Sequence, residues 1–170
     1  MTALLRRAVP DDAPRLALLA RWVWLDSYAD GGVQMAYVNH FDDALTADAF
    51  RASLLAPQQA LWVMEAGAAL QGFAQLRRQV PSPAADGGEP GTELERLYVS
   101  PRCTGRGLGK QLLAASRQTW PGDGLWLSVW AGNEGARRFY RREGGQVVGE
   151  TEFLLDGQAH RNLVFAWGAL

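Results

Sequence analysis

Three glycines, Gly105, Gly107 and Gly109, alternate along a short stretch that the sequence predicts to be a loop. Glycine lets a backbone close around an anion because no β-carbon stands in the way. The residues that follow have apolar side chains at helical spacing, and the first turn of a helix has unpaired N–H groups that favour negative charge. The loop therefore suits a phosphate group. A plain flexible turn is the alternative interpretation of the glycines alone, because the spacing matches neither Walker A nor Gly-x-Gly-x-x-Gly.

A predicted strand leads into this loop and a predicted helix follows it. Leu97, Tyr98 and Val99 favour an extended chain, and Pro101 ends the strand because its ring removes a ladder donor. Leu108 begins the helical pattern. This order of strand, glycine loop and helix predicts that the amides at the loop lie at a helix N-terminus.

The rest of the chain predicts an α/β fold in one domain over residues 1–170, with a mostly antiparallel sheet and one parallel step at the glycine loop. Residues 31–45, which include His40, are expected to form a long loop, and residues 81–91 a mobile loop within the domain. The predicted strands are 4–8, 60–65, 70–78, the stretch ending at Val99, 125–130, 146–155 and 161–167, with His160 in a hairpin turn. The predicted helices follow Asp11-Asp12, Thr46, Gly107 and Asn133.

Composition excludes several classes of protein. The single cysteine, Cys103, rules out an internal disulfide and a cysteine-rich metal site, and it suits a reducing cytoplasm. The first residues lack the apolar core of a signal peptide, and no run is long enough for a membrane span. A net charge of −1 argues against broad nucleic-acid binding. We therefore expect a soluble, cytoplasmic protein without a metal.

The charges are unevenly placed along the chain. Residues 96–142 contain nine Lys and Arg residues against Asp123 and Glu134, whereas residues 22–50 contain five Asp residues and no Lys or Arg. The first region suits an anion and the second a cation. Ordinary solvated surfaces are the alternative for both.

Taken with the glycine loop, the segment from Asn133 to Tyr140 resembles the GCN5-related N-acetyltransferases. That family's loop, Arg/Gln-x-x-Gly-x-Gly/Ala, holds the pyrophosphate of acetyl-coenzyme A, and Thr104, Gly107 and Gly109 match it, with Thr104 in place of Arg or Gln. The resemblance covers nearly the whole chain and is greatest to PaiA-type polyamine acetyltransferases. It implies a twisted, mixed, mostly antiparallel sheet of six to seven strands flanked by about four helices. Gly145 departs from the aromatic residue that is usual there, so we expect looser packing around it.

The resemblance implies acetyl-coenzyme A as co-substrate. Main-chain groups of the strand before the loop would pair with the pantetheine arm, amides of the loop would hold the pyrophosphate, and basic side chains would meet the nucleotide phosphates. The residues assigned to this role are Leu97, Tyr98, Val99, Thr104, Gly105, Arg106, Gly107, Leu108, Gly109, Lys110, Asn133, Arg138, Tyr140 and Arg142.

Acetyl transfer to an amine needs a neutral amine and a proton for the departing thiolate. By analogy with the family, Tyr140 supplies that proton, since a phenol stays protonated at neutral pH. Glu95 is the candidate base, with Glu93 or water as alternatives. Alternatively, Tyr140 is an ordinary helix residue whose hydroxyl lies in water. The alternative for Glu95 is an ordinary surface carboxylate. A Cys103–His nucleophile is disfavoured, because no His lies near it in the sequence.

The expected acceptor is a small cationic amine, such as a polyamine. The acidic stretch 22–50 and the PaiA-type resemblance both favour it, and Trp24, Tyr28 and Glu93 are candidates for binding it. Trp24 and Tyr28 are four residues apart and equally fit a core stripe. Three alternatives remain: a protein or peptide N-acetyltransferase, a non-catalytic coenzyme A sensor and, more distantly, a Rossmann dehydrogenase. The resemblance also admits a homodimer.

Overall fold

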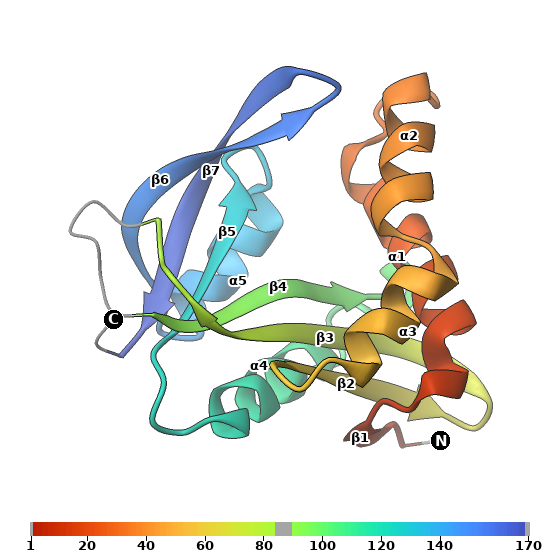
Figure 1. Cartoon of the computed structure of the whole chain (residues 1–170), viewed down its shortest axis with the longest axis vertical. Coiled ribbons are helices and arrows are strands. Elements are labelled where there is room, and N and C mark those ends of the chain that lie inside the picture. Colours follow the sequence, from red (N-terminus) through yellow and green to blue (C-terminus); the bar gives the residue numbers. More distant parts are fainter. Residues whose placement is uncertain (1, 84–89, 169–170) are drawn as a thin grey trace. The chain divides into compact units, whose positions relative to one another are not determined.

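The computed structural model describes residues 2–83 and 90–168, so most of the predicted 81–91 loop lies outside the described residues. Seven strands form one sheet in the order β1-β2-β3-β4-β5-β7-β6, and the described residues also form five α-helices (Figure 1). The strands are β1 (Leu4–Arg7), β2 (Gln59–Ala66), β3 (Ala69–Val80), β4 (Gly91–Val99), β5 (Leu125–Trp130), β6 (Gln146–Leu155) and β7 (Gln158–Trp167). The helices are α1 (Ala13–Tyr28), α2 (Met35–Ala44), α3 (Ala47–Leu55), α4 (Leu108–Thr119) and α5 (Glu134–Arg142).

The predicted α/β class is confirmed. Strands β4 and β5 pair in parallel, with Thr92 opposite Leu125 and Glu93 opposite Trp126, and this is the parallel step expected around the glycine loop. The pairs β1–β2, β5–β7 and β6–β7 are antiparallel.

One helix was not anticipated. Residues 35–44, predicted as loop, form α2, so that His40 lies on a helix and not in a loop. His160 likewise lies within strand β7, opposite Phe153, and not in a turn. The pair Gly31-Gly32 argued for a long loop, yet Tyr37, Phe41 and Leu45 follow at helical spacing, and all three are buried.

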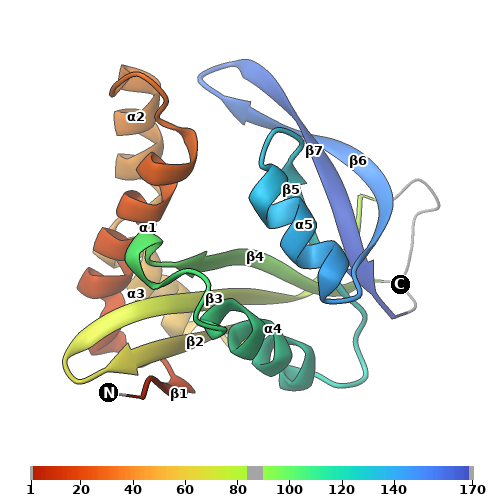
Figure 2. The same cartoon turned by 180° about the vertical axis from the view of Figure 1, so that it is seen from behind.

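The chain groups into two compact units. The first holds the described residues of 1–76 and 96–119, and the second those of 77–95 and 120–170. In the first unit, α1 and α3 cover one face of the sheet and α4 covers the other (Figures 1 and 2). In the second unit, α5 lies against β5 and β7 (Figure 2).

The core of the first unit follows from strand alternation. The ring of Phe73 on β3 lies 5.6 Å from that of Phe50 on α3 and 5.4 Å from that of Tyr98 on β4, measured between centroids. On the α4 side, a β-carbon at Gly72 would meet Leu112 Cδ1 at 3.3 Å and Val99 Cγ2 at 3.4 Å. Gly72 therefore lets α4 pack closely over the centre of the sheet.

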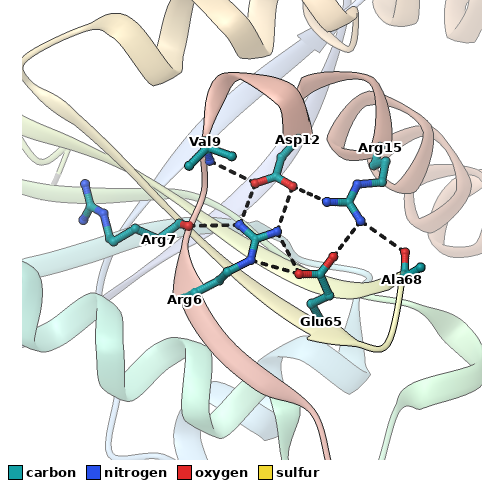
Figure 3. A network of polar contacts seen from close by, with 7 residues as sticks. All are labelled: Arg6, Arg7, Val9, Asp12, Arg15, Glu65 and Ala68. Atoms are coloured by element: carbon teal, nitrogen blue, oxygen red, sulfur yellow. Dashed lines mark hydrogen bonds and ion pairs between the residues drawn. The ribbon is translucent and has the colours of Figure 1, made fainter.

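A polar network holds the start of α1 to the sheet (Figure 3). Asp12, whose side chain is 1% exposed, accepts hydrogen bonds from Arg6 at 2.7 and 2.9 Å and from Arg15. Glu65 on β2 accepts from both arginines, at 2.9 and 2.7 Å. Burial of these charges is tolerated because each has an opposite partner.

Candidate acetyl-coenzyme A site and acceptor face

The glycine loop has the backbone geometry that an anion site requires. Gly105 and Gly107 have φ values of +75° and +78°, in the left-handed region that favours glycine, and no atom lies within 4 Å of a β-carbon built on either. Helix α4 begins at Leu108, directly after them. The first hydrogen bond of the helical pattern runs from the Gln111 amide to the Gly107 carbonyl at 3.2 Å, so the amides of the first turn of α4 precede it and are available as donors.

These features fit a pyrophosphate group. Amides at the N-terminal turn of α4 supply donors and a favourable dipole for negative charge. The flanking Arg102, Arg106 and Lys110 are exposed and add positive charge. Thr104 is also exposed, and its hydroxyl donates to the carbonyl of Pro101 at 3.1 Å. In this conformation Thr104 closes the turn before the loop, and its hydroxyl already has a partner in the protein.

The backbone of β4 leads directly into the loop. Leu97, Tyr98 and Val99 are half-buried, and the ladder between β3 and β4 extends to the bond from the Ser100 amide to the Gln71 carbonyl at 2.8 Å. The parallel register with β5 ends at Glu93, four residues before Leu97. Residues 97–99 therefore lie on the part of β4 beyond that register, where an extended ligand arm can pair with the strand.

Strand alternation separates the side chains of β4 into two sets. Tyr98 and Arg96 lie on the face covered by α3, since Tyr98 packs on Phe73 and the Arg96 guanidinium lies 5.8 Å from the ring centre of Phe50. Val99 lies on the α4 face. Glu95 and Glu93 alternate with Arg96 and so share the direction of Val99. Glu95 is half-buried, and Glu93 lies 3.7 Å from Arg77 in an ion pair.

Helix α5 in the second unit carries the other residues of the predicted site. Asn133 is its N-cap, and its side-chain oxygen accepts from the Ala136 amide at 3.0 Å. Arg138 and Arg142 are exposed, and each has an acidic neighbour: Glu134 at 3.2 Å and Glu143 at 3.4 Å. Asn133 thus caps α5. The charges of Arg138 and Arg142 are partly neutralised by these glutamates.

Tyr140 is buried, with 7% of its surface exposed. Its ring lies 5.7 Å from that of Phe165 and 5.9 Å from that of Trp167, both on β7. The carbonyl of Tyr140 accepts from the Gly145 amide at 2.9 Å. The phenol is therefore held in one place by the packing of α5 on β7, which is what a positioned proton donor needs.

The expected loose packing at Gly145 is wrong. The glycine is buried, and a β-carbon there would lie 2.6 Å from Cζ2 of Trp167. The Trp167 indole occupies the space that a side chain at position 145 would need, and its N–H donates to the Glu143 carbonyl at 3.0 Å.

Trp24 and Tyr28 belong to an aromatic cluster that joins α1 to α2. The ring of Trp24 lies 4.9 Å from those of Tyr28 and Tyr37 and 5.4 Å from those of His40 and Phe41. Trp24 is only 5% exposed, whereas Tyr28 and His40 are half-buried. The cluster thus has a buried centre at Trp24 and an accessible rim, and only recognition of α2 could have placed His40 in it.

Other chemistry finds less support. Cys103 is partly exposed, and its sulfur is contacted by Arg106 at 3.8 Å. Within residues 2–83 and 90–168, no three His, Cys, Asp or Glu side chains gather as a metal site would need. No helix of that same part is both long and apolar enough to cross a membrane.

The loop geometry and the fold agree with comparisons to known proteins. An N-acetyltransferase from the pepI 3′ region of Lactobacillus delbrueckii subsp. lactis is 25% identical over 148 residues, covering 85% of this chain and 84% of that protein. An N-acetyltransferase of Mycobacterium tuberculosis (strain ATCC 25618 / H37Rv) is 29% identical over 130 residues, 74% of this chain and 78% of that protein.

Solved structures give the same fold. The crystal structure of the PaiA N-acetyltransferase from Thermoplasma acidophilum, in complex with coenzyme A, superposes with a TM-score of 0.74 at 22% identity, over 96% of this chain and 98% of that one. The model of the acetyltransferase (GNAT) family matches residues 16–145, which is well over half of the sequence. The chain therefore belongs to the acetyltransferase (GNAT) family.

Proposed function

We propose that this acetyltransferase moves the acetyl group of acetyl-coenzyme A to the primary amine of a small cationic acceptor of the polyamine kind. The observation that carries the choice of acceptor is a group of exposed carboxylates on and beside α1 and α2, three of which have no ion-pair partner among the described residues. They are Asp26, Asp30 and Asp43. Carboxylates without a neutralising partner attract a polycation, because their electric field extends over a long range.

The two remaining aspartates of this region are partly compensated. Asp42 lies 3.7 Å from Arg21, and Asp48 on α3 accepts from Arg51 at 2.6 Å. Both pairs are exposed and contribute little to stability. The uncompensated charge thus gathers on and beside α1 and α2, and α3 is nearly neutral.

Each reacting group has a proposed role. The amides of 105–110 and the basic side chains around them would hold the pyrophosphate, and residues 97–99 the pantetheine arm. Acetyl-coenzyme A supplies an acyl group activated as a thioester. Tyr140 is the proposed donor to the departing thiolate, and Glu95, Glu93 and water are the candidates for the base that the sequence alone offers.

We also propose that residues 1–170 act as a single N-acetyltransferase domain in the cytoplasm. The lone, partly exposed Cys103 suits a reducing compartment.

The experiment that tests the acceptor class is a steady-state assay with spermidine, a lysine-containing peptide and an aminoglycoside. It compares the wild type with the double variant Asp26→Asn/Asp30→Asn and with the control Asp48→Asn. We expect spermidine to be the preferred acceptor, with its KM raised roughly three- to tenfold in the double variant only and the KM for acetyl-coenzyme A unchanged.

Other outcomes identify the alternatives. Preference for the peptide would support a protein or peptide N-acetyltransferase and reject a small acceptor. Tight acetyl-coenzyme A binding without acetylation of any amine would support a sensor. An unchanged KM for spermidine in the double variant would remove the charge argument.

A further inference from the structure

His40 is a titratable side chain on one of the two helices that carry the acidic residues. It lies on α2 in the aromatic cluster, with its ring 5.4 Å from that of Trp24 and 6.2 Å from that of Phe41. The imidazole is half-buried, so one side packs on aromatic rings and another remains accessible. The three uncompensated carboxylates Asp26, Asp30 and Asp43 lie on or beside the same two helices.

Asp43 of α2 and Arg96 of β4 are charged groups that act on this imidazole. Arg96 is held firmly, because it donates to Gln75 at 2.7 Å and lies over the ring of Phe50. Gln75 is 3% exposed and in turn donates to Ser53 at 3.1 Å and to Gln59 at 3.3 Å. The positive charge on this side of β4 is therefore fixed by a buried network.

Successive side chains of β4 point to opposite faces of the sheet. By strand alternation, Glu93 and Glu95 point with Val99, which approaches α4, whereas Arg96 and Tyr98 point toward α3. His40 belongs to the helices on the Arg96 side of the sheet. The helix-covered face that carries the acidic residues thus has its own proton acceptor.

We propose that His40 is the base that removes a proton from the ammonium group of the acceptor. This assignment rests on the proposed function, because it requires a cationic amine beside α1 and α2. The acceptor R–NH₃⁺ gives one proton to the neutral imidazole, which passes it to water. Of the two protons left on nitrogen, one leaves with the thiol and one remains on the amide as the C–N bond forms and the C–S bond breaks.

The environment keeps the imidazole in the form that can accept a proton. Burial lowers the pKa of His40 from its ordinary value of 6.5, Arg96 lowers it further, and Asp43 acts in the opposite direction. At neutral pH the ring is therefore mainly uncharged. It neither repels a cationic acceptor nor needs to lose a proton first.

Trp24 is a positioning residue in this arrangement. It is 5% exposed and packs against His40, so its role is to hold the imidazole and not to touch the acceptor. Tyr28, half-buried and 4.9 Å from Trp24, is the aromatic residue that an alkylammonium can reach.

The test is the pH dependence of kcat/KM between about pH 5 and 9, measured with spermidine and with the lysine-containing peptide. With a base on the enzyme, the protonated amine is the substrate, and kcat/KM is level above the pKa of the base and falls below it. Without one, only the rare neutral amine reacts, so kcat/KM rises tenfold per pH unit throughout. We expect the wild type to show the plateau and His40→Gln to lose it, with activity at pH 7 reduced roughly 10²-fold.

Three variants make the assignment specific. Glu95→Gln is expected to keep the plateau, and a plateau that is lost in Glu95→Gln and kept in His40→Gln would overturn the proposal. His160→Gln, which removes the only other histidine, should match the wild type. Asp43→Asn should move the acidic limb to lower pH, because the charge that raises the pKa of His40 is gone. A merely structural role for His40 would not produce that movement.

Folding and acceptor class are controlled separately. If His40→Gln lowers the melting temperature, His40→Asn and Trp24→Phe are measured as well. Loss of the kcat/KM plateau in a variant that remains folded then supports the assignment of His40. If the wild type acetylates the peptide but not spermidine, the small-acceptor proposal fails. The role of His40 is then tested by the pH dependence of kcat/KM with the peptide as acceptor. As a direct readout, spermidine should shift the NMR signal of the His40 imidazole and not that of His160. An unmoved His40 signal with spermidine as a working acceptor overturns the assignment.

Discussion

The indole of Trp167 fills the space in front of Gly145, so that a β-carbon on Gly145 would lie 2.6 Å from Cζ2 of Trp167 and 3.0 Å from the carbonyl oxygen of Tyr140. Trp167 is 6% exposed, and its ring also packs against that of Tyr140. The glycine, the indole and the proposed proton donor therefore form one packed group in the second unit.

Replacing Gly145 by alanine should destabilise the protein, because the new methyl group forces the Trp167 ring or the backbone of α5 to move. Overpacking of this kind costs about 1–3 kcal/mol. Urea unfolding measures the loss, and Gly122→Ala is the matched control, since no atom lies within 4 Å of a β-carbon there. Equal stability of the two variants would show that the indole moves aside at no cost.

Tyr140→Phe should lower kcat while leaving the fold intact. The ring contacts to Phe165 and Trp167 persist in the variant, and only the hydroxyl is removed. Loss of a positioned proton donor reduces the rate by roughly 10²-fold. Thiol release at saturating substrates measures kcat, and an unchanged KM for acetyl-coenzyme A is the internal control. A fully active Tyr140→Phe enzyme would assign the proton to another group.

Gly107→Ala should weaken binding of acetyl-coenzyme A. At a φ of +78° a side chain costs about 1–2 kcal/mol, so the loop relaxes and turns its amides away from the phosphates. We expect the KM for acetyl-coenzyme A to rise roughly tenfold, since about 1.4 kcal/mol corresponds to a factor of ten. Isothermal titration with coenzyme A tests the same point without catalysis. The acceptor KM should not change, and an unaltered coenzyme A affinity would contradict the loop assignment.

Asp12→Asn should be strongly destabilising, because it leaves Arg6 and Arg15 without their shared carboxylate beneath the start of α1 (Figure 3). Breaking a buried ion pair on one side costs about 3 kcal/mol. Asp48→Asn is the control: its carboxylate, 93% exposed, pairs only with Arg51, and its loss should change little.

The same network predicts a pH dependence. Hydrogen bonds from Arg6 hold the pKa of the Asp12 carboxyl far below its usual range. A carboxyl with a depressed pKa stabilises the fold at pH values above its unfolded pKa of about 3.9, and that contribution is lost as the pH falls below it. The free energy of unfolding should therefore decline between about pH 5 and 2 in the wild type and less steeply in Asp12→Asn.

The sequence was enough to predict the α/β class, the parallel step and the glycine loop. These features depend on local rules: β-branched and aromatic residues favour strands, Pro101 ends one, and glycines with a following apolar period define a loop and a helix N-terminus. The residues of the loop are contiguous in the sequence, so they lie close together in space whatever the rest of the fold is. The prediction that the amides of 105–110 bind a phosphate therefore needed no knowledge of the fold.

Tertiary structure decided what depends on residues far apart in the chain. Gly31-Gly32 concealed α2, which is stabilised by the burial of Tyr37 and Phe41 against Trp24 and not by its own propensity. Gly145 was expected to leave a gap, because nothing local shows that Trp167, 22 positions later, fills it. Tertiary structure likewise decides which helix covers each face of β4. It also brings His40 close to Arg96. Non-local packing is stabilised by buried surface that no short stretch contains. For that reason the glycine loop could be predicted from the sequence, whereas helix α2 and its aromatic cluster could not.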